Sequence, residues 1–318
     1  MTPQAAQVAE AYRVSREIAR REAKNFYYAF VALPEAKRNA ICAVYAFMRH
    51  ADDLSDDETK TIEQRREALT AWLDAWHRAS TGEPTADPVF IALADAQQRF
   101  HISSELLDQL VHGTSMDLYR ADGLASPESV DETAQFRYDT YATFPELYQY
   151  CYYVASVVGL VCIRIFGYSD RRAEKLAEET GIAFQLTNIL RDVREDAERG
   201  RIYLPLEDLE RFGVTPDELA ALKDGRHLTL NQRELLETEA GRAEQYYTSG
   251  EALLPLISED ARPALWVLIT IYHRLLRRIE EQQFDVFSAK VSVPTVTKLW
   301  ILLRGTLRVI GNRLRGRG

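Results

Sequence analysis

Apolar residues recur three and four positions apart along most of the chain, a spacing that predicts helices with one buried face. Pro, Gly and polar stretches separate these segments. Helices are predicted at Val8–Ala32, Ala36–His50, Ile62–Ser80, Val89–Phe100, Ser104–Arg120, Phe144–Gly167, Ala173–Glu198, Leu206–Phe212, Pro216–Leu222, Asn231–Leu253 and Pro263–Gln283. No run alternates apolar and polar residues as a strand would. The pattern therefore predicts an all-α fold, with a single domain over residues 1–318 because no linker divides the chain.

An acidic motif ends the predicted helix at Ala173–Glu198. Asp192 and Asp196 stand one turn apart on one helix face, and Gln185 and Asn188 precede them on the same stripe. Like charges at this spacing destabilise an isolated helix by about 0.2–0.5 kcal/mol. A magnesium ion would offset the repulsion, because Mg²⁺ prefers one or two carboxylates together with phosphate oxygens and water. The alternative is a solvated acidic face, the usual explanation of a single pair.

A second acidic cluster continues the helix predicted at Ala36–His50. Arg49, Asp52, Asp53 and Asp56 stand at i, i+3, i+4 and i+7, so they share one helix face. Two acidic clusters far apart in sequence, each with an arginine beside it, favour a shared metal site over two independent solvated faces. The predicted metal ligands are Asp52, Asp53, Asp56, Asp192 and Asp196.

Composition and charge narrow the class of protein. The net charge of −9 argues against nucleic acid as a partner. The three cysteines form no C-x-x-C pair, which is typical of buried small residues in a reducing compartment. The N-terminus has no basic patch before an apolar run, and the apolar stretches Val154–Ile165 and Leu265–Tyr272 fall short of the roughly 20 residues that span a bilayer. A cytoplasmic protein is therefore expected.

The C-terminal tail, residues 298–318, is basic although the whole chain is acidic. A basic amphipathic tail beside Trp300 can lie on the anionic inner face of a membrane, as a peripheral contact. Alternatively, the apolar face of the tail closes the helical bundle while its arginines meet solvent. The sequence leaves both interpretations open.

Four motifs in order resemble the squalene/phytoene synthase family over nearly the full length of the chain. They are FYYAF at Phe26–Phe30, AVYAFMRHADDLSD at Ala43–Asp56, YCYYVASVVG at Tyr150–Gly159 and QLTNILRDVREDAERGRIYLP at Gln185–Pro205. Either acidic motif alone also occurs in other prenyl synthases and terpene cyclases, but the ordered set is specific. The resemblance implies an isoprenoid-synthase helical bundle around a central apolar cavity. It also implies a Mg²⁺-dependent prenyltransferase that joins two prenyl diphosphates head to head (1′-1).

The resemblance also assigns roles to individual residues. About two or three Mg²⁺ ions, held by the aspartates of the two motifs, would neutralise the diphosphate leaving group. The implied catalytic residues are Tyr150, near the proton-removal step, and Asp52, Asp56, Asp192 and Asp196. The implied diphosphate contacts are Arg49, Arg191, Tyr45, Tyr272, Lys24, Gln185, Asn188 and Lys290. The segment around Lys24 departs from the family, which often has serines beside this lysine where the chain has Ala23 and Asn25.

The resemblance leaves more than one function open. Two farnesyl diphosphates would give presqualene diphosphate, and squalene if NADPH then delivers a hydride; the YCYYVA element and the D-D-x-x-D form favour this leading interpretation. Two geranylgeranyl diphosphates would give phytoene, which the NILRDV element and the Val291–Lys298 region also suit. A non-catalytic helical binding or assembly protein on the same fold would typically lack the acidic motifs, and both are intact here.

Overall fold

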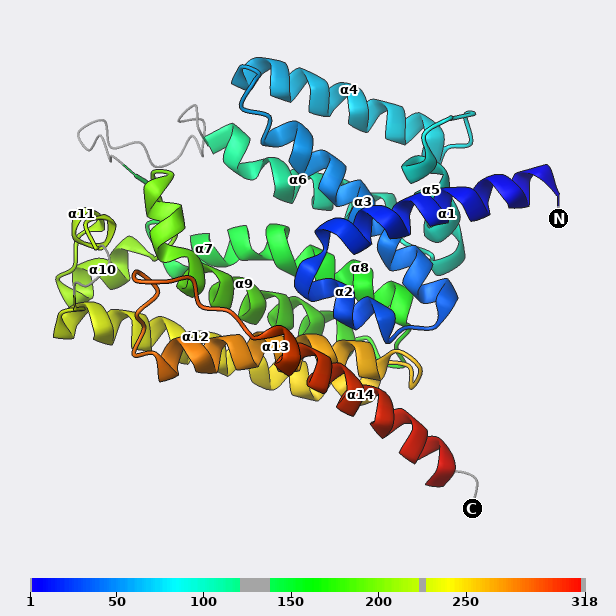
Figure 1. Ribbon diagram of the computed structural model, residues 1–318. Coiled ribbons are helices and arrows are strands. Elements are labelled where there is room, and N and C mark those ends of the chain that lie inside the picture. The colour runs from blue at the N-terminus through cyan, green and yellow to red at the C-terminus, as the bar shows by residue number, and fades with distance from the viewer. Residues whose placement is uncertain (1, 121–137, 223–226, 316–318) are drawn as a thin grey trace.

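The computed structural model describes residues 2–120, 138–222 and 227–315. The helices are α1 (Pro3–Glu22), α2 (Lys24–Val31), α3 (Glu35–Ser55), α4 (Ile62–Ser80), α5 (Pro88–Phe100), α6 (Ser104–Arg120), α7 (Phe144–Cys151), α8 (Val157–Phe166), α9 (Arg172–Glu198), α10 (Leu206–Phe212), α11 (Pro216–Ala220), α12 (Leu230–Leu253), α13 (Arg262–Glu281) and α14 (Thr295–Arg315). A π-helix, η1 (Tyr152–Ser156), joins α7 to α8, and a 3-10 turn, η2 (Leu254–Leu256), follows α12. The all-α prediction is confirmed (Figure 1).

Local sequence signals set the ends of several helices. Thr61 begins α4 with a capping box, in which its hydroxyl accepts from the N–H of Gln64 and the Gln64 side chain accepts from the Thr61 N–H. Thr229 and Gln232 repeat this arrangement at the start of α12. These reciprocal bonds satisfy backbone donors that a helix start otherwise leaves unpaired. The predicted starts at residues 62 and 231 are therefore correct to within one residue.

Three features differ from the predicted elements. The helix expected at Val8–Ala32 is two helices, because the chain breaks at Ala23 without a Pro or Gly to mark the break. The helix expected at Ala36–His50 extends to Ser55 and so includes part of the acidic motif. Two-residue strands, β1 (Asp139–Thr140) and β2 (Arg201–Ile202), pair in parallel, and they are too short to leave an alternating pattern.

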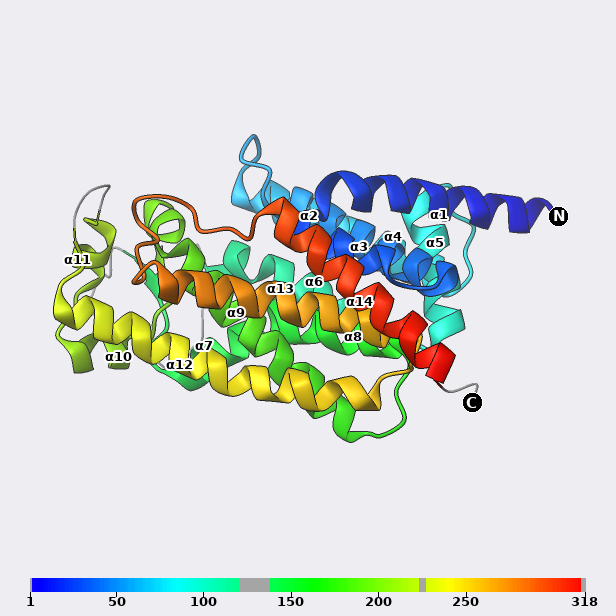
Figure 2. The same ribbon diagram turned by 60° about the horizontal axis from the view of Figure 1, so that its bottom comes forward.

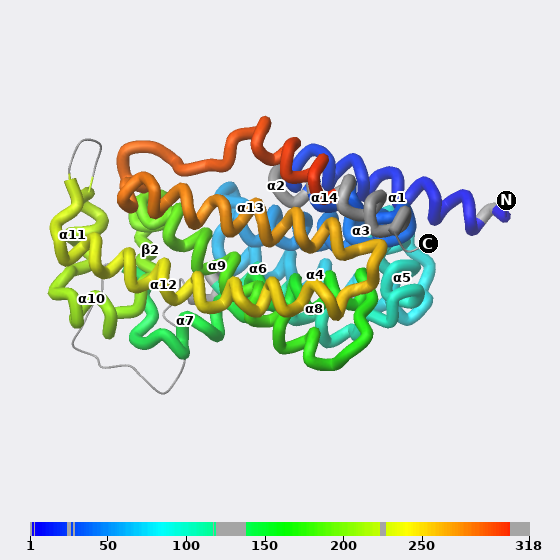
Figure 3. Tube along the Cα trace, turned by 90° about the horizontal axis from the view of Figure 1, so that it is seen from below, coloured from blue at the N-terminus to red at the C-terminus, as the bar shows by residue number. Residues whose placement is uncertain are grey.

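Helix α9 organises the core. It packs against α12, α8, α13 and η1, while α12 and α13 run side by side along one face of the bundle (Figure 3). Buried side chains from nearly every helix join one large hydrophobic cluster, and Phe47, Trp76 and Tyr247 are its largest fully buried members. Most of the helices thus share one main hydrophobic core. That residues 1–318 form a single domain stays a prediction.

The apolar segment Phe144–Phe166 forms one rod through α7, η1 and α8. Its 23 residues satisfy the length and composition of a membrane span, which the shorter apolar stretches of the sequence do not. Helices α6 and α9 nevertheless pack along it, as expected of a core helix. Helix α9 approaches the rod closely at Gly159, because a Cβ atom on Gly159 would lie only 3.1 Å from the Ala177 carbonyl oxygen.

Glycines clamp this rod from both sides. A Cβ atom on Gly113 of α6 would lie 2.4 Å from the carbonyl oxygen of Tyr153. A Cβ atom on Gly181 of α9 would lie 2.5 Å from the Cα atom of Ser156. Real Cβ atoms do not approach backbone this closely, so the three helices reach their spacing only because both positions lack a side chain.

Two buried carboxyl groups share one arginine where α12 meets α10. Arg242 donates hydrogen bonds to Glu239 at 2.7 and 2.8 Å and to Asp208 at 3.0 Å, and its guanidinium lies 4.1 Å from the Phe144 ring centroid. Burial raises the pKa of Glu239 from 4.5 to about 8; Arg242 opposes this rise and the Asp208 carboxylate adds to it.

We expect the free energy of unfolding to fall as the pH rises from 4.5 to about 8. In this interval folded Glu239 holds a proton that the unfolded chain has released, so folding takes up a proton and weakens as protons become scarce. Glu239→Gln should flatten the profile by roughly 1–2 kcal/mol across the interval. Urea unfolding at a series of pH values measures this change, with the exposed Glu237→Gln on the same helix as the control. If the free energy of unfolding changed equally with pH in the unchanged protein, Glu239→Gln and Glu237→Gln, Glu239 would have an ordinary pKa.

Candidate active site

The two acidic motifs lie at the carboxyl ends of α3 and α9, which point toward the same end of the molecule (Figure 1). Asp52 and Asp53 belong to the last turn of α3, and Asp56 follows it, donating its N–H to the Asp52 carbonyl at 2.8 Å. Asp192 and Asp196 belong to the last turns of α9. Among the residues that the structure describes, no three His, Cys, Asp or Glu side chains gather closely enough to form a preformed metal cluster. The shared metal site therefore stays a prediction.

The first motif combines acidic groups with one arginine. Arg49 forms an ion pair with Asp53 at 2.5 Å, and both side chains are exposed to solvent. Asp52 is half-buried, and burial, together with the Asp56 carboxylate, raises the pKa of Asp52 to about 7. Tyr45, two turns earlier on α3, packs edge-on against Phe30, and burial raises the pKa of Tyr45 to about 12.

The second motif carries two cations around one aspartate. Both Arg191 Nε, at 2.8 Å, and a terminal nitrogen of the same guanidinium donate to the Asp192 carboxylate. Lys290, in the loop between α13 and α14, places its Nζ 3.3 Å from the Asp192 carboxylate and also pairs with Glu195. The fold therefore brings Lys290 to the motif from almost 100 residues away in the sequence. The guanidinium and ammonium groups can bind the oxygens of a phosphate group, and the carboxylate can bind a metal cation that accompanies the phosphate.

Asn188 carries an unsatisfied oxygen one helical turn before Asp192. Its amide nitrogen donates to Gln185 at 3.3 Å, whereas its Oδ1 atom is buried without a hydrogen-bond partner. An orphaned buried acceptor destabilises a protein by about 1–3 kcal/mol unless a ligand satisfies it. Tyr272 lies beside Asn188 and stacks on Phe184 with ring centroids 4.4 Å apart, and burial raises the pKa of Tyr272 to about 12.

The donors at this end of α9 fit a magnesium ion. The Asn188 amide oxygen and the Asp192 and Asp196 carboxylates all supply hard oxygen ligands, and they are spaced one turn apart. Asp52 and Asp56 supply the same type of ligand from α3. Asp53 and Asp192 also supply carboxylate oxygens, and each of them pairs with a neighbouring arginine, Arg49 and Arg191 respectively. Mg²⁺ takes carboxylate and amide oxygens together with substrate oxygens, so the donor set and the orphaned oxygen both suit it.

Tyr150 lies in a stack of tyrosines. Its side chain is 6% exposed, and its ring stacks on Tyr203 with centroids 4.9 Å apart and packs at a tilt against Tyr141 with centroids 5.4 Å apart. The pairing of β1 with β2 brings the stacking partners together, because Tyr141 directly follows β1 and Tyr203 directly follows β2. Sequence reasoning missed both partners: Tyr203 sits in the R-G-R-I-Y-L-P ending, which could have identified it, whereas Tyr141 carries no such signal.

The predicted diphosphate contact of Lys24 has no described side chain. The backbone of Lys24 begins α2, but its side chain lies outside the described residues.

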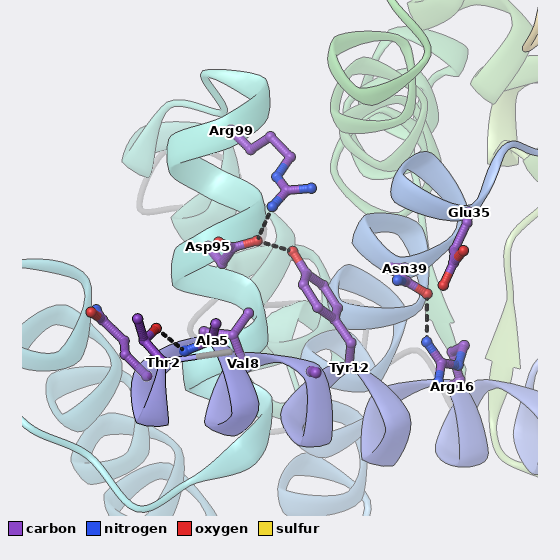
Figure 4. Close-up of a pocket in the computed structure, with 11 residues that line it drawn as sticks. Thr2, Ala5, Val8, Tyr12, Arg16, Glu35, Asn39, Asp95 and Arg99 are labelled. Atoms are coloured by element: carbon purple, nitrogen blue, oxygen red, sulfur yellow. Dashed lines mark hydrogen bonds and ion pairs between the residues drawn. The ribbon is translucent and has the colours of Figure 1, made fainter.

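A cavity of about 530 Å³ opens between α1, α3 and α5, where Tyr12 donates to Asp95 at 2.6 Å and Arg16 donates to Asn39 at 2.8 Å (Figure 4). Asn39 lies about 20 Å along α3 from the acidic motif. This polar groove is not the predicted central apolar cavity, which stays a prediction.

The squalene/phytoene synthase family matches residues 19–297 of the chain. The chain belongs to this family. A 15-cis-phytoene synthase of Synechocystis sp. is 35% identical over 320 residues, which cover 95% of this chain and 86% of that protein. A presqualene diphosphate synthase of Zymomonas mobilis subsp. mobilis is 34% identical over 283 residues, covering 89% of each chain. A crystal structure of a dehydrosqualene synthase in complex with ligand has a TM-score of 0.80 at 29% identity and covers 97% of this chain and 99% of that one.

Membership of the squalene/phytoene synthase family confirms two expectations drawn from the motifs. The first is the isoprenoid-synthase helical bundle, because the dehydrosqualene synthase structure matches along nearly the whole of both chains. The second is the class of enzyme, a prenyltransferase. The matched range contains every predicted site residue, from Lys24 to Lys290. Their individual roles stay predictions.

Proposed function

We propose that the protein joins two molecules of geranylgeranyl diphosphate head to head, with loss of both diphosphate groups and a proton, to form phytoene. The observation that carries the reaction class is the cluster on α9, where Asp192 lies between Arg191 and Lys290, one turn beyond the orphaned oxygen of Asn188. The choice of product rests on relatives. The residues of the motifs favour farnesyl diphosphate as the substrate. The similarity to the phytoene synthase of Synechocystis sp., which matches 95% of the chain, favours geranylgeranyl diphosphate and phytoene instead.

The cations of the site bind the diphosphate groups. Arg191 offers several N–H donors in a plane, so it can hold two phosphate oxygens at once, whereas Lys290 acts as a mobile point charge. Arg49 supplies a third cation from α3. Mg²⁺ held by Asp52, Asp56, Asn188, Asp192 and Asp196 would neutralise charge on the departing diphosphate.

The aromatic stack around Tyr150 suits the next stage. Loss of diphosphate leaves an allylic cation, which the double bond of the second chain attacks before a proton leaves to give a cyclopropylcarbinyl diphosphate. Water would quench the cation, so its surroundings must be apolar and closed. The faces of Tyr150 and Tyr203 stabilise positive charge, and both rings are buried. The Tyr150 hydroxyl is the group that we assign to proton removal.

The second candidate reaction uses two farnesyl diphosphates. The Zymomonas relative, a presqualene diphosphate synthase, matches 89% of this chain at nearly the same identity as the phytoene synthase. This reaction stops at presqualene diphosphate, or continues to squalene if NADPH donates a hydride. It uses the same aspartates and cations, so the site described here serves both reactions.

Product analysis separates the candidates. Purified protein is incubated with Mg²⁺ and either geranylgeranyl or farnesyl diphosphate, with and without NADPH, and the extracted lipids are identified by mass. We expect a C40 product from geranylgeranyl diphosphate that does not require NADPH. A C30 product alone would replace phytoene by the farnesyl reaction. No product from either substrate, with unchanged diphosphate binding in Asp192→Ala, would overturn the enzyme function itself.

A further inference from the structure

The helix α14 presents apolar side chains on two faces. Its inner face closes the bundle: Ile301 is buried, and Gly305 lies against Trp266 and Val267 of α13. Figure 2 shows α14 lying across α13 and beside α2, which agrees with its contacts to both helices. This is the bundle-closing arrangement that the sequence left open, but it uses only part of the helix surface.

The outer face of α14 carries a second apolar stripe that faces solvent. Val296, Leu299, Trp300 and Leu303 are 77%, 50%, 55% and 58% exposed, and they stand at i, i+3, i+4 and i+7. Large apolar side chains this exposed are few among the described residues, and four of the six lie in this stripe. Scattered exposed apolar residues need no explanation, whereas a contiguous stripe marks an interaction surface.

The charge around the stripe indicates what covers it. Residues 295–318 contain six basic residues and no acidic residue, although the chain carries a net charge of −9. The guanidinium of Arg304 lies 5.2 Å from the Trp300 ring centroid, so a cation stands directly beside the apolar stripe. A second copy of this helix would bring like charges together. An anionic lipid surface offers both an apolar interior and opposite charge.

We propose that the outer face of α14, formed by Val296, Leu299, Trp300 and Leu303, docks on a membrane surface that contains anionic lipids. The helix lies in the plane of the interface, with the leucines and the valine in the acyl region, Trp300 at the headgroup level and Arg304 among the lipid headgroups. Because helices α6 and α9 pack along the apolar rod Phe144–Phe166, we take the contact to be peripheral rather than spanning. The inference does not depend on which diphosphate is the substrate.

Vesicle binding by the full-length protein tests this docking face. The probes are vesicles of phosphatidylcholine alone and vesicles of phosphatidylcholine with phosphatidylglycerol, followed by co-sedimentation. We expect binding to be about tenfold or more stronger with phosphatidylglycerol present, and to weaken as salt is added. The double variant Leu299→Ser/Leu303→Ser should bind these vesicles at least about tenfold more weakly, because two apolar anchors are removed.

Leu230→Ser is the matched control. Leu230 is also a leucine exposed on a helix, at 69%, but it lies at the start of α12 outside the stripe, so this variant should bind like the unchanged protein. Circular dichroism checks that each variant folds, and light scattering reports its oligomeric state. Absence of binding to anionic vesicles, or equal binding by the double variant, would overturn the proposal. A dimer that the double variant converts to a monomer, without vesicle binding, would assign the face to a second copy instead.

Discussion

Asp192→Ala is expected to lower the rate of product formation about a thousandfold while the helical fold is retained. Asp192 contacts both Arg191 and Lys290, and it is the proposed metal ligand one turn from the orphaned Asn188 oxygen. Its loss removes a ligand for the metal and leaves Arg191 and Lys290 without their shared counter-charge. Asp192→Asn keeps a hydrogen-bond acceptor for Arg191 but not the charge, so a comparable loss in that variant would assign the effect to charge.

The measurement is the initial rate of product formation over a range of Mg²⁺ concentrations, with circular dichroism as the check on folding. Glu198→Gln is the matched control, because it removes a negative charge from the same helix end at an exposed ion pair with Arg194. Exposed ion pairs contribute about 0–1 kcal/mol, so this control should keep nearly full activity. Equal rates for Asp192→Ala and Glu198→Gln would show that the acidic motif is only a solvated helix end.

Gly181→Ala is expected to destabilise the protein by about 2 kcal/mol or more. The new Cβ atom would meet Ser156 at its Cα, N and Oγ atoms at 2.5, 2.7 and 2.9 Å. Two of these atoms are backbone atoms of a helix that Gly113 holds from its other side, so the strain has no easy relief. Overpacking costs about 3 kcal/mol or more in such a rigid place, whereas alanine in a helix returns only about 1 kcal/mol.

Gly241→Ala is the same type of substitution, but we expect it to change the free energy of unfolding in the opposite direction. Gly241 lies within α12, is exposed, and has no atom within 4 Å of a Cβ built on it. Only the propensity gain remains there, so we expect a stabilisation of about 0.5–1 kcal/mol. Chemical denaturation of both variants measures the difference. A Gly181→Ala protein as stable as Gly241→Ala would mean that α9 and η1 can move apart freely.

The sequence predicts this fold well wherever one periodic signal decides it. The helices at Ile62–Ser80, Ser104–Arg120 and Leu206–Phe212 end as predicted, because polar stretches, caps or prolines interrupt the apolar spacing there. It fails where tertiary contacts decide. The break at Ala23 has no local mark, and β1 pairs with β2 through four residues that come from distant parts of the chain.

The candidate site divides in the same way. Both acidic motifs are readable from helical spacing, since Asp192 and Asp196 keep their relation on any regular helix. Tyr141 is not readable, because only the β1–β2 pairing brings it to Tyr150. The role of Lys290 is predicted from family resemblance alone, because only the fold places Lys290 beside Asp192.

The π-helix η1 has a consequence for how the rod serves the bundle. The π-helical turn holds one residue more than the α-helical turns around it. The side-chain faces of α7 and α8 are therefore rotated relative to each other by about 100° around the helix axis. Cys151 and Ser156, which bracket most of this turn, are buried, while the four residues between them are only partly covered. The extra residue thus gives this stretch its own orientation, in which the side chains of two adjacent tyrosines, Tyr152 and Tyr153, stay partly covered although the Tyr153 backbone lies within the glycine clamp.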